Sequence, residues 1–187
     1  MQRIIDEIKQ HLVTDYFDVY HDIGHHYSVW SNGIEIAQSE KLTYDYKIFE
    51  LSAWLHDTDK GNETQNFLKS LALKYSELSE IFLKVENVIA EHSFGQTQTT
   101  VESKLLYDAD KIELVSLPRW QNAFNQYEEN LITIEQRDKY VSEWNRRMPL
   151  LKGNLHFNES NAMFETKYSK FIIWLEAIGR WHDGIFT

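Results

Sequence analysis

The 187-residue sequence contains no cysteine, which excludes disulfide bonds, thiolate metal sites and cysteine nucleophiles. It has only 2 prolines and 7 glycines, so few residues interrupt regular helices. No apolar run reaches the roughly 18 residues of a membrane span, and the N-terminal MQRIIDEIKQ lacks the layout of a signal peptide. We therefore expect a soluble, cytoplasmic protein with no membrane partner.

Positive charge is also scarce, since 19 Lys and Arg face 29 Asp and Glu for a net charge of −10. Surfaces that bind nucleic-acid polymers or anionic membranes are rich in Lys and Arg, so neither partner is expected. A small anionic substrate would then need a local positive centre. A metal ion can supply one.

What the sequence does contain is helical periodicity. No long stretch alternates apolar with polar residues as a half-buried strand would. The composition, 42% hydrophobic and 26% charged, predicts one all-α domain over residues 1–187. The aromatic residues, 14% of the chain, are expected to fill its core. Helices are predicted at about 2–13, 20–38, 45–57, 63–74, 77–92, 100–115, 119–130, 134–148 and 160–182.

Capping signals support several of these helix ends. Small polar residues precede some of the apolar patterns, as N-caps do, and two glycines follow helix ends, where a left-handed residue is favoured. The candidate N-caps are Asp45, Ser76 or Ser79, Thr100 and Thr133, and the candidate C-terminal glycines are Gly95 and Gly153.

The dipeptide His-Asp occurs three times, at 21–22, 56–57 and 182–183, where chance gives roughly half an occurrence. The second pair follows the stripe of Ile48, Leu51 and Trp54, so it emerges from a buried helix. The pair at 182–183 has no partner motif and is interpreted as chance.

The same test identifies further inward polar residues. His92 continues the apolar stripe that contains Val85 and Val88 in helix 77–92. In YDADK, Asp110 lies four residues from both Leu106 and Leu114 and should face inward, where a carboxylate is costly unless it is paired or metal-bound.

Two assignments from periodicity are less direct. Asp108 lies four residues after Lys104 and three before Lys111, which predicts an exposed acid with ion-pair neighbours. In helix 20–38, His25 lies on one apolar stripe and His26 at the edge of another that contains Tyr27, so burial on two sides is expected. Periodicity leaves the choice between the two histidines open.

Four motifs together carry a family resemblance. They are HDIGH (21–25), WLHD (54–57), EHSFG (91–95) and ESKLLYDADKIE (102–113). In order and spacing they resemble the HD-domain metal-dependent phosphohydrolases, and most of all the small stand-alone bacterial members. The resemblance covers residues 21–115, and helices over 119–187 would complete the bundle.

The resemblance implies an all-helical HD-type bundle that binds a divalent metal ion, such as Mn²⁺, Mg²⁺, Ni²⁺, Co²⁺ or Fe²⁺. It implies that the metal ligands are His25, His56, Asp57 and Asp110. The reaction would be hydrolysis of a phosphate ester or anhydride in a small phosphorylated substrate, most plausibly a nucleotide.

The remaining candidate roles follow from position around these ligands. Asp57 and His92 are candidate catalytic residues, and Lys60 and His21 are candidate substrate-binding residues. Two alternatives remain open, a hydrolase of a signalling nucleotide (an alarmone or a cyclic nucleotide) and a non-catalytic metal-binding regulatory module. Lys60 counts against the alarmone version, because alarmone hydrolases have an acid at that position.

Overall fold

A computed structural model of the chain describes residues 1–14, 22–58 and 62–178, and these residues contain nine α-helices and no strand. Contacts divide the chain into two compact units, residues 1–110 and 111–187, with the boundary inside α6. None of the helices in the described ranges is long and apolar enough to cross a membrane. The fold is thus all-α as predicted, whereas the single domain over 1–187 stays a prediction. The α-helices are α1 (Gln2–Thr14), α2 (Ile23–Ser39), α3 (Tyr46–Leu55), α4 (Asn62–Lys74), α5 (Ser79–Glu91), α6 (Val101–Ile112), α7 (Leu117–Glu128), α8 (Ile134–Leu151) and α9 (Asn158–Ile178), with short 3-10 helices η1 (Ser76–Leu78) and η2 (Glu113–Val115).

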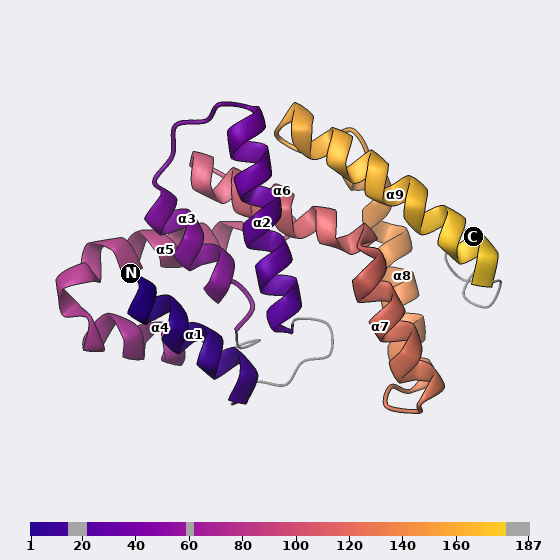
Figure 1. Ribbon diagram of the computed structural model, residues 1–187, viewed down its shortest axis with the longest axis horizontal. Coiled ribbons are helices and arrows are strands. Elements are labelled where there is room, and N and C mark those ends of the chain that lie inside the picture. Colours follow the sequence, from indigo (N-terminus) through magenta and orange to yellow (C-terminus); the bar gives the residue numbers. More distant parts are fainter. Residues whose placement is uncertain (15–21, 59–61, 179–187) are drawn as a thin grey trace. The chain divides into compact units, whose positions relative to one another are not determined.

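The first unit is built around α3, which packs against α1, α2 and α5 (Figure 1). The predicted stripe of α3 is buried, with Leu51 and Leu55 fully inside and Trp54 3% exposed. On α5, Phe82, Val85 and Val88 face the core. This packing brings the C-terminal ends of α3 and α5, which carry His56 and His92, into the same region.

The expectation that α2 is buried on two sides is wrong. Val29 and Ile36 are fully buried, but Ile23 is 37% and Tyr27 55% exposed. The helix packs along the stripe that carries His25, and the stripe through Tyr27 faces outward. Helical periodicity detected both apolar stripes but could not tell which one has a neighbour.

Helix ends follow their sequence signals closely. Asp45 accepts hydrogen bonds from two backbone amides at the start of α3, and Thr133 forms a capping box with Gln136. Thr100 accepts from the amide of Ser103, and Gly95 and Gly153 have positive φ as predicted. The capping role predicted for Ser76 or Ser79 is wrong, because α5 follows directly on η1 and its N-cap position, Leu78, makes no side-chain bond.

Helix α3 is shorter than the predicted 45–57. It ends at Leu55, and His56 and Asp57 lie in the turn that follows. The Thr58 side chain donates to the Leu55 carbonyl (3.0 Å), and the His56 ring donates to the Ala53 carbonyl (2.9 Å). These bonds satisfy carbonyls that a helix C-terminus leaves without amide partners, and so they favour ending the helix there.

The second unit has an aromatic core. Trp120 and Trp144 are buried against the fully buried Phe171, with ring centroids 5.1 and 5.3 Å away. Both indole N–H groups donate to the Leu114 carbonyl, at 2.7 and 3.2 Å. This unit therefore uses its aromatic residues as core, as the sequence predicted.

Gly33 sets the close approach of α2 to α3. A Cβ at this position would lie 2.1 Å from Cζ of the fully buried Phe49, a distance at which the two cannot coexist. We expect Gly33→Ala to lower the free energy of unfolding by about 1–3 kcal/mol through overpacking. In denaturant unfolding, adding Phe49→Leu should recover part of that loss. A Gly33→Ala protein as stable as wild type would contradict this packing.

Candidate metal centre

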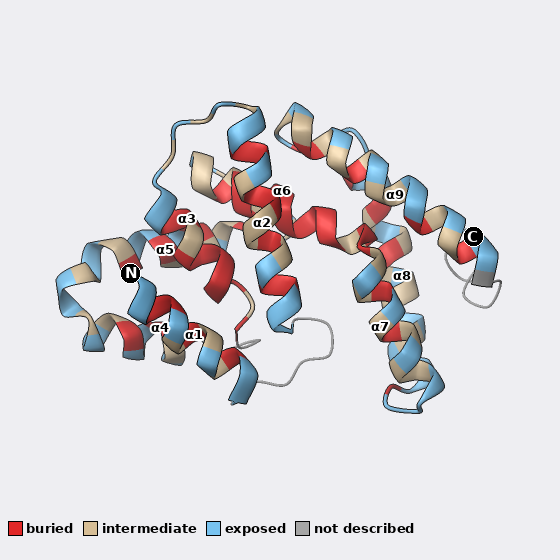
Figure 2. Ribbon diagram, viewed as in Figure 1, coloured by how far each residue is buried: buried red, intermediate tan, exposed pale blue. Residues whose placement is uncertain are grey.

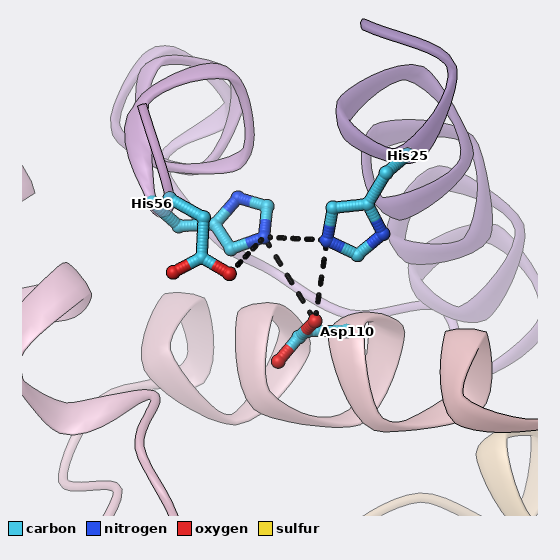
Figure 3. Close-up of side chains that lie close together, drawn as sticks. His25, His56 and Asp110 are labelled. Atoms are coloured by element: carbon cyan, nitrogen blue, oxygen red, sulfur yellow. Dashed lines mark hydrogen bonds and ion pairs between the residues drawn. The ribbon is translucent and has the colours of Figure 1, made fainter. Parts of the chain in front are cut away.

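Four side chains from separate parts of the first unit meet at one place (Figure 3). His25 lies in the first turn of α2, His56 and Asp57 follow α3, and Asp110 lies near the end of α6. Each offers one ligand atom, and these atoms all lie within 4.8 Å of one another. The structure thus brings together the four residues that the family resemblance implied as ligands.

The distances between these atoms fit a shared ion. Nε2 of His25 lies 3.2 Å from Nε2 of His56, and Oδ1 of Asp110 lies 3.5 and 3.8 Å from these two nitrogens. Oδ2 of Asp57 lies 3.9 Å from Nε2 of His56. Ligand atoms about 2.1 Å from a common ion lie about 3 Å apart at right angles and about 4.2 Å apart when opposed. The cluster can therefore bind a divalent metal ion without rearrangement of the backbone.

The orientation of His56 is fixed by the end of its own helix. Its Nδ1 donates to the Ala53 carbonyl (2.9 Å), and because a carbonyl only accepts, the proton is on Nδ1 and the lone pair on Nε2. Burial lowers the pKa of His56 to about 4, outweighing the nearby carboxylates of Asp57 and Asp110, which raise it. His56 is therefore neutral near pH 7, which is the form that ligates a metal.

The structure resolves the choice between His25 and His26. The backbone amide of His25 donates to Asp22, the N-cap of α2 (2.9 Å), and the His25 ring enters the cluster. The His26 ring is also buried, but its Nδ1 lies 3.3 Å from the Ala53 carbonyl oxygen and it is not one of the four clustered residues. This arrangement favours His25 as the ligand.

The prediction that Asp108 is an exposed acid is wrong. Asp108 is 0% exposed and Asp110 is 8% exposed, and Lys111 is buried as well. Asp108 lies three residues after Leu105 and four before Ile112, both fully buried, so it belongs to a second inward stripe that the sequence reading passed over. Figure 2 shows α6 buried along most of its length. Asp110 nevertheless faces the cluster as predicted.

His92 lies at the edge of the cluster. It follows the last residue of α5, its Nδ1 donates to the Ile89 carbonyl, and its Nε2 lies 3.8 Å from Oδ1 of Asp57. The side chains of His92 and Asp57 are 10% and 20% exposed, whereas that of His56 is 0% exposed. His92 is thus buried as its stripe predicted, and the accessible edge of the cluster is the Asp57–His92 side.

Two predicted substrate-binding residues, Lys60 and His21, lie outside the residues that the structure describes. Their assignments stay predictions. Lys60 is three positions after Asp57 and His21 four before His25, so both adjoin the ligands in sequence.

Sequence reasoning missed a polar residue that connects ligand-bearing helices. Asn32 on α2 is 6% exposed, and its side-chain amide donates to the Ala109 carbonyl (3.3 Å), directly before Asp110. Its spacing of seven residues from His25 places it on the same face of α2, and that spacing could have identified it.

Comparison with solved structures identifies the fold. A predicted HD superfamily hydrolase from an uncultured Thermotogales bacterium is 21% identical to this chain, with a TM-score of 0.65 over 94% of this chain and 90% of that one. This chain has the HD fold.

Two further structures share the HD fold. A protein from Lactobacillus plantarum is 14% identical, with a TM-score of 0.73 over 96% of both chains. Bacillus subtilis YpgQ, solved in complex with ADP, is 16% identical, with a TM-score of 0.66 over 97% of this chain and 99% of that one. A comparison with known protein families finds no match, and neither does one with curated proteins. The HD fold and the His–Asp cluster together support a metal-dependent hydrolase.

We expect the two acids of YDADK to differ in metal binding. Asp110→Ala removes a carboxylate from the cluster and should abolish binding of Mn²⁺, Ni²⁺ or Co²⁺. Asp108→Ala should keep the metal but lower stability, because it leaves a cavity and buried partners at a site that is 0% exposed. Elemental analysis and denaturant unfolding separate these effects, and equal metal loss from both variants would contradict the assignment of Asp110.

Metal should also stabilise the wild-type protein. An ion that binds only the folded state at 100 times its dissociation constant adds about 2.7 kcal/mol, which corresponds to a rise of about 5–11 °C in Tm for a chain of this size. A chelator should reverse the rise. Asp110→Ala is the control and should show no shift. Absence of any shift in the wild type with all three ions would contradict a metal site.

Proposed function

We propose that this chain is a metal-dependent phosphohydrolase that acts on a nucleotide or a similar small phosphate ester or anhydride. The observation that carries the proposal is the cluster of two imidazoles and two carboxylates with one accessible edge. A protein of the same fold, YpgQ, was solved with ADP, which supports a nucleotide as the substrate class. With a net charge of −10, the chain also needs a cation to hold a phosphate.

The proposed ligands are His25, His56, Asp57 and Asp110. Four N and O ligands leave positions for water and a phosphate oxygen on a six-coordinate ion such as Mn²⁺, Mg²⁺, Ni²⁺, Co²⁺ or Fe²⁺. When bound, such an ion polarises the phosphoryl group and lowers the pKa of its bound water. The remaining steps belong to side chains of the protein.

Asp57 is proposed as the carboxylate that orients the attacking water and accepts its proton. Its two oxygens face different neighbours, with Oδ2 3.9 Å from Nε2 of His56 and Oδ1 3.8 Å from Nε2 of His92. Its side chain is the most exposed of the cluster at 20%, so water can reach it. A carboxylate placed between the ligand cluster and the accessible edge can serve both as a ligand and as a general base.

His92 is proposed to act on the phosphoryl oxygens. The bond from its Nδ1 to the Ile89 carbonyl directs Nε2 toward Asp57 and the accessible edge. In its protonated form, His92 would donate to a phosphoryl oxygen on which negative charge develops in the transition state. Lys60 and His21 are proposed as further contacts to the substrate phosphate.

The test is a panel of nucleotides assayed for released phosphate and pyrophosphate with each candidate metal. Wild type should hydrolyse at least one member, and Asp57→Asn should lower kcat by at least about 10²–10⁴, the usual range for general-base catalysis. His92→Gln should lower kcat while keeping the metal, because His92 lies outside the four clustered residues. His156→Gln, at an exposed histidine, is the matched control and should retain full activity.

Each outcome has a separate meaning. If wild type hydrolyses no phosphate ester or anhydride, the proposed activity is wrong and a metal-binding regulatory module takes its place. If activity is present but confined to alarmones or cyclic nucleotides, the substrate is a signalling nucleotide. If Asp57→Asn keeps wild-type turnover, the catalytic role of Asp57 is wrong.

A further inference from the structure

The Ala53 carbonyl connects two imidazoles. Its oxygen lies 2.9 Å from Nδ1 of His56 and 3.3 Å from Nδ1 of His26. A carbonyl oxygen has two lone pairs, so it can accept both bonds at once. Since Ala53 is on α3 and His26 on α2, the second bond joins the two helices that carry His25 and His56.

The His26 ring also packs beside both ligand rings. Its centroid lies 4.8 Å from that of His56, with the planes 60° apart, and 5.6 Å from that of His25, with the planes 68° apart. His26 is 0% exposed and is not among the four clustered residues. It is therefore a buried polar side chain that contacts the ligands without joining them.

We propose that His26 is a positioning residue of the metal centre. By donating to the Ala53 carbonyl, it holds fixed the group that orients His56, and by packing against His56 it limits rotation of that ring. The tautomer of His56 and the direction of its Nε2 then depend on α2 as well as on α3. This inference rests on the proposed role of His25 and His56 as ligands.

Three substitutions separate the donor from the shape of the side chain. His26→Asn places an amide N–H near the position of Nδ1 and should keep metal affinity close to that of wild type. His26→Leu has no donor, and His26→Gln places its donor one bond further out, near the position of Nε2. Both should weaken Mn²⁺ or Ni²⁺ binding by about 10–100-fold, as loss of outer partners of metal ligands does.

The matched control is Ile36→Ala, on the same helix and fully buried. It should lower stability while leaving metal affinity unchanged, because its side chain is not part of the cluster and does not contact the Ala53 carbonyl. Calorimetric titration gives the affinities, and denaturant unfolding gives the stabilities. Nitrogen-15 NMR of the imidazoles adds a readout without metal. His56 should have its proton on Nδ1 in wild type and His26→Asn, and should populate a second tautomer in His26→Leu and His26→Gln.

The outcomes distinguish this inference from the proposed function. If wild type binds no metal, both are wrong. If wild type binds metal and His26→Leu and His26→Gln bind it as tightly, or His26→Asn binds as weakly as they do, the positioning role alone is wrong. Equal loss of affinity in Ile36→Ala would also overturn it, since general destabilisation would then explain the effect. If His26→Leu does not fold, the comparison of His26→Gln with His26→Asn decides.

Discussion

The hydrogen bond from His56 to the Ala53 carbonyl is the constraint on which the candidate metal centre depends. A helix C-terminus leaves carbonyls without amide partners, and here an imidazole satisfies one of them. The bond places the proton on Nδ1, so Nε2 presents a lone pair to His25 and Asp110. Burial keeps this ring neutral by lowering its pKa to about 4. One local bond thus sets the position, tautomer and charge of the central residue.

Helix α5 ends in the same way. His92 occupies its C-cap position and donates from Nδ1 to the Ile89 carbonyl three residues earlier, so its Nε2 is directed toward Asp57. The C-terminal ends of α3 and α5 therefore both point their negative dipole ends at this region, whereas α2 contributes one N-terminal end through His25. Such a field favours a cation and disfavours an unaccompanied phosphate. It agrees with a net charge of −10 in making the ion the likeliest anchor for an anionic substrate.

Helix α2 sets the spacing of the elements that carry the ligands. Gly33 lets it approach Phe49 on α3, and Asn32 connects it to the backbone just before Asp110 on α6. These contacts involve a missing side chain and main-chain carbonyls, which impose little on the residues around them. Proteins only 14–21% identical can therefore share this arrangement of helices.

The sequence alone determined the nine helices, the stripe of α3 and the inward direction of His92, because periodicity reports where a side chain points relative to its own helix. Its four motifs also named the residues of the cluster, through a family resemblance. Only the tertiary structure separated His25 from His26, exposed Tyr27 and buried Asp108. Those outcomes depend on which faces of a helix have neighbours. Helix α6 is enclosed on more than one side and α2 is not, and no pattern within a single helix encodes that difference.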